Sequence, residues 1–161
     1  QFSDHSITRV YQALVWGKIR PQNGKIETFI TRSSRNRQMM EVSTKKGKSA
    51  VTNYKTLEIF ENEKIPTFSL IECKLETGRT HQIRVHLTHI GLPVIGDQVY
   101  GTGFKSKINK YDDAIRNILL NASNRQSLHA YKLGFEHPTS KKNMLFETNL
   151  PHAMQEVSDI L

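Results

Sequence analysis

The sequence of 161 residues has a single cysteine and lacks any long apolar run. Cys73 therefore cannot form an intramolecular disulfide, a zinc knuckle or a CxxC redox pair, and a cytoplasmic setting is expected. No stretch approaches the roughly 20 apolar residues that span a bilayer. The opening residues, QFSDHSITRV, lack the basic start and apolar run of a signal peptide. The sequence thus predicts a soluble protein that contacts no membrane.

Acidic residues are scarce in one part of the chain. Residues 18–55 hold ten Lys or Arg against only Glu27 and Glu41, an excess of eight that equals the net charge of the whole chain, +8. A concentrated basic segment suits a polyanion, because each neutralised phosphate releases counterions. A solvated basic surface has the same composition. Charge alone therefore leaves nucleic-acid binding and a plain solvated surface both open.

Turn signals divide much of the chain into predicted strands. Within Ala50–Glu58, apolar and polar positions alternate as is typical of a partly exposed strand in an antiparallel sheet. The length is that of one ordinary domain, so a single core is expected. The predicted strands are VYQALVWG, GKIETFITR, MMEVS, AVTNYKTLEIFE, FSLIECKL, SLHAYKLGFEH and NMLFETNL.

A helical period appears in three places. Ile83, Leu87 and Ile90 follow an i, i+4, i+7 pattern, which predicts a helix near residues 80–90. Thr80 is its expected N-cap, and Gly91 and Pro93 are expected to end it. A short helix is predicted around Ile115, Ile118 and Leu119, and a C-terminal helix opened by Pro151 with the apolar stripe Met154, Val157 and Leu161.

The stretch Leu75–Gly101, LETGRTHQIRVHLTHIGLPVIGDQVYG, joins glycines and basic residues to the first predicted helix. His81, Arg84 and Thr88 share a helical face nearly opposite the apolar one, which predicts that this face points to a cleft or to solvent. The free N–H groups of the helix start, with Arg79 and His81 beside them, suit a phosphate or a carboxylate. The alternative is that these side chains are simply solvated.

The predicted helix contains three histidines, His81, His86 and His89, which are residues that can bind a metal. His81 and His86 are five residues apart and lie on different faces, and Asp97 follows beyond a turn. A metal ion needs its ligands to converge. Solvated or core histidines are therefore expected, and no metal site is predicted.

The segments LETGRTHQIRVHL and IGLPVIGDQVYG together resemble the third sequence motif of the pseudouridine synthase family that modifies large-subunit rRNA and some tRNAs. TRVYQALVWG resembles that family's tyrosine-bearing strand, GKSAVTNYKTLE its next long strand, and QSLHAYKLGFEHPTS its late strand and turn. The resemblance covers essentially residues 1–161. It implies an α+β fold with a mostly antiparallel sheet flanked by helices and a central cleft, and an isomerase that uses no cofactor and no metal.

The resemblance also implies roles for individual residues. Tyr11 is the tyrosine that stacks on the flipped uracil and takes part in the reaction, whereas strand packing alone would explain a tyrosine there. Arg84 pairs with the catalytic aspartate and keeps it ionised. Ile83 packs against the uracil, although core packing explains an isoleucine equally well.

Further residues are assigned to RNA contact or support. Arg79, His81 and Gln82 are assigned to RNA contact and motif support, and Asp97 to a turn or cap. Cations in the basic loops are expected to grip the RNA backbone and to set affinity more than sequence choice. These are Arg32, Arg35, Arg37, Lys45, Lys46 and Lys48. Gly78, Gly96 and Gly101 are expected to serve backbone geometry.

One element of the family pattern is absent, since none of the five aspartates follows His-Arg-Leu. The resemblance places that HRLD motif upstream of Tyr11, so the half that carries it is expected to precede Gln1, and the sheet is expected to be incomplete. Three hypotheses follow: a fragment of an active synthase that is inactive alone, a non-catalytic RNA-binding module, or a basic β-rich domain that binds an acidic protein. An exposed strand edge also predicts self-association.

Overall fold

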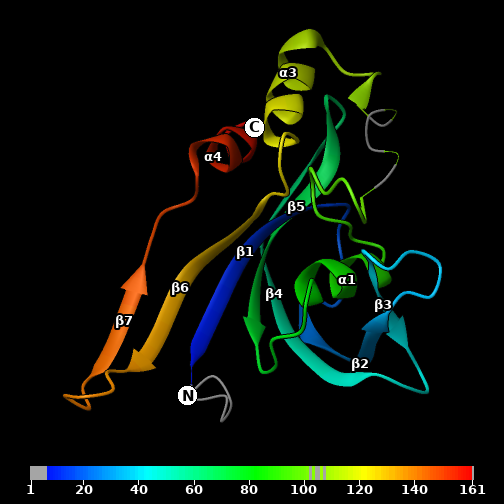
Figure 1. The fold of residues 1–161 in the computed structure, drawn as a ribbon. Coiled ribbons are helices and arrows are strands. Elements are labelled where there is room, and N and C mark those ends of the chain that lie inside the picture. Colours follow the sequence, from blue (N-terminus) through cyan, green and yellow to red (C-terminus); the bar gives the residue numbers. More distant parts are fainter. Residues whose placement is uncertain (1–6, 102, 104–105, 107, 161) are drawn as a thin grey trace.

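The computed structural model describes residues 7–101, 103, 106 and 108–160, and the described part is built around one large sheet (Figure 1). Its strands are β1 (Thr8–Trp16), β2 (Asn23–Arg32), β3 (Met40–Ser43), β4 (Lys48–Asn62), β5 (Ile65–Leu75), β6 (Leu128–Glu136) and β7 (Asn143–Glu147). Its helices are α1 (Gln82–His89), α3 (Asp113–Ala122) and α4 (His152–Ser158).

The seven strands follow the order β3-β2-β4-β5-β1-β6-β7, and every pairing between them is antiparallel. Each of the predicted strand segments forms one of these strands, and the α+β class with a mostly antiparallel sheet is confirmed. β3 and β7 are the two edges of the described sheet. Self-association through an exposed edge stays a prediction.

The central strands are buried on both faces, as β1 shows. Ala13 and Val15 lie in a cluster with Ile83 and Leu87 of α1, whereas Leu14 and Trp16 lie in a cluster with residues of α3 and α4. Because successive side chains of a strand point to opposite faces, α1 covers one face of the sheet and the α3–α4 pair covers the other. Figure 1 shows α3 and α4 together at one end of the sheet.

Helix α1 ends as the sequence predicts, at Gly91. Gly91 has φ +81°, its N–H donates to the Thr88 carbonyl, and the Leu92 N–H donates to the Leu87 carbonyl. These two bonds form a Schellman motif, which satisfies carbonyls at the end of the helix. The start differs from the prediction, because the N-cap is His81 and not Thr80.

The chain after this turn runs back along β1. The Trp16 N–H donates to the Pro93 carbonyl and the Ile95 N–H donates to the Leu14 carbonyl, so Val94 bridges Val15 in antiparallel register. This return brings residues 94–101 against α1, and it is the feature of the fold that completes the site described below.

The later part of the chain also matches its predicted elements. Helix α3 contains Ile115 and Ile118, which pack against the core, and α4 places Met154 and Val157 in it. Pro151 is the N-cap of α4. The third member of the predicted stripe, Leu161, lies outside the described residues. Among the helices of the described residues, none has the length and apolarity needed to cross a membrane.

Candidate functional site

The centre of the candidate site is a buried ion pair between α1 and the returning segment. The Nε of Arg84 lies 2.7 Å from Oδ2 of Asp97, and its Nη2 lies 2.8 Å from Oδ1. The two residues are 8% and 3% exposed. A parallel pair of charge-assisted bonds fixes the guanidinium in both position and plane.

Both partners are ionised in this pair. Burial alone would raise the pKa of Asp97, but the hydrogen bond from Arg84 and the backbone N–H groups of Tyr100 and Val99 outweigh it and hold that pKa below its usual value. The hydrogen bond to Asp97 raises the pKa of Arg84. The Asp97 carboxylate therefore acts as a fixed counter-charge for Arg84.

The burial of Arg84 excludes solvent exposure, which is one of the two surroundings predicted for its helical face. The spacing of His81, Arg84 and Thr88 places them on one face of α1, but the segment 94–101 covers part of that face. Its Asp97 binds Arg84, and the Thr88 hydroxyl oxygen is buried as well. Asp97 is also the turn residue that was predicted, because its Oδ1 accepts the N–H groups of Val99 and Tyr100 at 3.0 Å.

Tyr100 completes the surroundings of Arg84. The guanidinium carbon of Arg84 lies 4.8 Å from the centre of the Tyr100 ring. The Tyr100 hydroxyl accepts the Met40 N–H at 2.8 Å and lies 2.9 Å from Nδ1 of His81. Sequence reasoning did not identify Tyr100 or the pairing of Asp97 with Arg84. The available signal was the Gly91 turn, which reverses the chain and carries Asp97 and Tyr100 back toward α1.

Tyr11 and Ile83 lie on the same side of the sheet. Tyr11 is half-buried on β1, opposite Cys73 of β5 and Ala130 of β6, and it packs against the cluster that contains Ile83. Ile83 is 5% exposed in that cluster, and Arg84 is the next residue along α1. The fold thus brings the strand that carries Tyr11 and the helix that carries Arg84 to one face.

Gln82 belongs to the framework of the site. It is 2% exposed, and its amide nitrogen donates to the Val51 carbonyl and the Thr52 hydroxyl. Its Oε1 accepts from the Thr77 hydroxyl and the Arg79 N–H. Of the two roles predicted for Gln82, these contacts suit support of the motif, because burial removes its side chain from the surface that an RNA would meet.

Three of the predicted RNA-contacting cations line one cavity of about 470 Å³. They are Arg32 of β2, Lys48 of β4 and Arg79 of the segment before α1, and no carboxylate is among the described residues that line it. Arg79 donates through Nε to the Ser49 carbonyl at 2.9 Å, and Arg32 donates through Nη1 to the Arg37 carbonyl. Each guanidinium is thereby held by one bond and keeps further donors for a ligand.

The other four predicted cations are exposed in the turns on either side of β3. Arg35 and Arg37 lie between β2 and β3, and Lys45 and Lys46 lie between β3 and β4. Together with the cavity they form a basic surface at the β3 edge of the sheet. That distribution suits the phosphates of an extended polyanion, which are contacted by side chains from several loops.

Sequence reasoning also missed Arg9. Its Nε is buried without a hydrogen-bond partner among the described residues. A Cβ atom on Gly78 would overlap the Arg9 Nη1, so Gly78 makes room for this guanidinium. Its φ is outside the left-handed region, which corrects the expectation that Gly78 serves backbone geometry.

Two named pseudouridine synthases resemble this chain over nearly its whole length. Ribosomal large subunit pseudouridine synthase D of Zymomonas mobilis is 47% identical over 156 residues, which cover 96% of this chain and 45% of the relative. The protein of the same name from Neisseria meningitidis is 40% identical over 161 residues, 100% of this chain and 40% of the relative. The chain therefore spans about half the length of these relatives.

A solved structure supports the same relationship. Human RNA pseudouridylate synthase domain containing 1 superposes with a TM-score of 0.72 at 27% identity, over 92% of this chain and 56% of that one. The sequence profile described as RNA pseudouridylate synthase matches residues 1–89, more than half of the chain. The chain belongs to the RNA pseudouridylate synthase family.

Proposed function

We propose that this chain supplies part of the active site of an enzyme that isomerises specific uridines to pseudouridine in RNA, most directly in large-subunit (23S) rRNA. Two relatives that match nearly the whole chain carry the large-subunit name. tRNA is the second substrate class that the family resemblance allows. The reaction detaches uracil from its ribose, turns the base and rejoins it through carbon instead of nitrogen.

The observation that carries the proposal is the way Arg84 is held. Asp97 binds the Nε and Nη2 edge of the guanidinium, and Nη1 has no hydrogen-bond partner among the described residues. Its side chain retains 10% exposure. The second edge of a planar guanidinium can take another carboxylate. We assign that edge to the catalytic aspartate, whose pKa such pairing lowers by roughly 1–3 units.

That aspartate comes from outside these 161 residues, because the chain contains no HRLD sequence. The chain alone is then inactive, and its contribution is a platform and a clamp. A target uridine has to leave its stack to be reached. Tyr11 stacks on the flipped base, Ile83 packs against it, and Arg84 orients the carboxylate. Neither a cofactor nor a metal takes part in this scheme.

The basic surface holds the RNA in the same proposal. Arg79 and Arg32 line the cavity, His81 lies beside it, and the exposed cations around β3 extend it. These contacts go to phosphates, so they set affinity and its salt dependence more than sequence choice.

The experiment that tests the enzymatic proposal maps pseudouridine in large-subunit rRNA with and without the gene that encodes this chain. Loss of modification at one or a few uridines, restored by the wild-type gene but not by a Tyr11→Phe version, is expected. If every site is modified equally in the presence and absence of the gene, the chain belongs to no active rRNA synthase. The same comparison on tRNA separates the two substrate classes.

A second candidate, a non-catalytic RNA-binding module, is favoured by one observation: the cationic cavity is complete within the chain while the catalytic carboxylate is not. RNA binding by the complete gene product without any change in pseudouridine would select it. The absence of measurable RNA affinity at low salt would exclude both candidates and favour a basic domain that binds an acidic protein.

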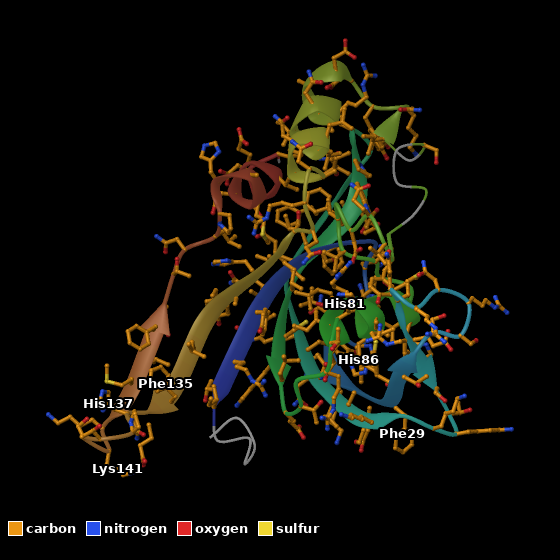
Figure 2. All side chains as sticks on the ribbon, viewed as in Figure 1. Phe29, His81, His86, Phe135, His137 and Lys141 are labelled. Atoms are coloured by element: carbon orange, nitrogen blue, oxygen red, sulfur yellow. The ribbon has the colours of Figure 1, made fainter. Side chains whose placement is uncertain are left out.

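The cavity has its own test through salt dependence. Replacing Arg32 and Lys48 with glutamine is expected to make the slope of log K against log salt less steep by about one for each phosphate that is no longer neutralised. Lys141→Gln is the matched control, because Lys141 lies in the β6–β7 turn, remote from His81 and α1 (Figure 2). Equal slopes for the double variant and the control would remove the cavity from the RNA interface.

A further inference from the structure

Tyr100 links three separate parts of the candidate site. Its hydroxyl accepts the N–H of Met40, the first residue of β3, at 2.8 Å, and it lies 2.9 Å from Nδ1 of His81 at the start of α1. Its ring faces the Arg84 guanidinium at 4.8 Å. One side chain therefore joins the basic β3 edge, the helix start and the buried arginine.

His81 is held in a backbone conformation that needs support. Its φ of 57° and ψ of 17° lie in the left-handed region, and its side chain makes no capping bond to α1. A non-glycine residue in this region is strained, and such residues persist where surrounding contacts hold them. The contact that holds this side chain is with Tyr100, whose ring meets the imidazole edge-on at 76° with 5.7 Å between ring centres.

The Tyr100 hydroxyl can accept one hydrogen bond and donate another. The oxygen already accepts from the Met40 N–H, so its own hydrogen can be donated to Nδ1 of His81. In that arrangement the ring proton lies on Nε2, which is the donor of a neutral imidazole. Burial, followed by the charge of Arg84, lowers the pKa of His81 and favours this neutral form.

We propose that Tyr100 is a positioning residue of the reaction: its ring orients Arg84, and its hydroxyl fixes His81 as an Nε2–H donor and ties the helix start to the RNA-binding edge at Met40. The proposal rests on the proposed function. It assigns Tyr100 no contact with the reacting atoms. It makes the placement of Arg84 and the docking of RNA on β3 depend on the same side chain.

The test compares Tyr100→Phe and Tyr100→Leu in the complete gene product. Phenylalanine keeps the ring beside Arg84 and removes the hydroxyl, whereas leucine removes both. Tyr111→Phe is the matched control, because Tyr111 also lies near a cation, the Lys110 ammonium 5.1 Å from its ring centre, but belongs to a different part of the chain. Circular dichroism of each variant checks that it is folded.

The expected results separate the two functions of the side chain. Tyr100→Phe raises the KM for RNA roughly fivefold with kcat nearly unchanged, since the hydrogen bonds to His81 and Met40 are removed. Tyr100→Leu also lowers kcat by roughly twofold to fivefold, since the guanidinium loses its aromatic support. Tyr111→Phe changes neither constant.

The pH dependence of kcat/KM distinguishes a positioning role of Tyr100 from a purely structural one. The groups that face His81 are Arg84 of α1, Asp97 and Tyr100 of the returning segment, and Arg32 of β2. In Tyr100→Phe the neutral ring loses its donor, so the pKa of His81 rises. The acid limb of kcat/KM is then expected to move to higher pH, and the histidine ring signals in NMR spectra are expected to titrate with it.

The outcomes distinguish this inference from the function on which it rests. If the wild type forms pseudouridine and Tyr100→Phe matches it in kcat, KM and pH profile, Tyr100 has no positioning role and the proposed function stands. If the wild type forms no pseudouridine, RNA affinity and the NMR titration still decide, and equal values for wild type and Tyr100→Phe overturn the inference. Because circular dichroism checks that Tyr100→Phe is folded, unchanged values for it cannot be attributed to misfolding and would overturn the inference.

Discussion

The buried His86 makes the stability of the fold dependent on pH. His86 has no exposed surface, and its two ring nitrogens each lie 2.9 Å from a hydroxyl, Nε2 from Thr28 of β2 and Nδ1 from Thr52 of β4. Figure 2 places it within α1, on the helix that also carries His81. Burial, with a smaller effect of the neighbouring His89, lowers the pKa of His86 from 6.5 to about 4.

The sign and size of the effect follow from proton linkage. Between pH 6.5 and about 4, His86 binds a proton in the unfolded chain but not in the folded one. Stability is then lost as the pH falls through this window and is fully present above it. A depression of the pKa from 6.5 to about 4 lowers the free energy of unfolding by about 3 kcal/mol when the pH falls across this window.

The assay is urea unfolding at pH 7.5 and pH 4 for the wild type and His86→Gln. Glutamine retains hydrogen-bonding groups for Thr28 and Thr52 but does not titrate. The wild type is expected to lose about 3 kcal/mol more than His86→Gln on acidification, because carboxylates titrate equally in both proteins. His89→Gln, at an exposed position on the same helix, is expected to lose nearly as much as the wild type, because it removes only the smaller of the two effects on the pKa of His86. An identical loss in wild type and His86→Gln would refute the reasoning.

Three further predictions concern the site itself. Arg84→Lys is expected to lower the rate of pseudouridine formation by about 100-fold, measured in single-turnover assays, because lysine cannot make the paired bonds that aim the guanidinium. An unchanged rate would contradict the proposal that Arg84 orients the catalytic carboxylate. Asp97→Asn leaves Arg84 as a buried charge without its counter-charge and is expected to cost about 3–5 kcal/mol in urea unfolding; a cost below about 1 kcal/mol would show that the pair is dispensable. Gly78→Ala is expected to cost less than about 1 kcal/mol in urea unfolding, because the new Cβ would meet only the end of the flexible Arg9 side chain, which can move aside. A cost above about 2 kcal/mol would show that the Arg9 guanidinium is held rigidly.

Most strands and helices of this fold can be predicted from local sequence patterns. Alternation predicts the strands because each strand repeats its exposure every two residues, and Gly91 and Pro93 predict where α1 ends because backbone geometry there is local. The family resemblance also followed from sequence, since the chain contains a contiguous motif of the family around Arg84. Tyr11 and Arg84 are therefore identified as candidates by the sequence alone.

The surroundings of Arg84 could not be predicted from local patterns, because they depend on how distant segments pack. Helical periodicity showed that it lies opposite the apolar face of α1, which by itself suggested exposure. The bridge between Val94 and Val15 folds the chain back over that face and delivers Asp97 and Tyr100 to the guanidinium. Periodicity describes the geometry of one element, whereas burial and pairing depend on which segment packs against it. For that reason the neighbours of Arg84, and the cavity formed by cations from three separate segments, emerged only in three dimensions.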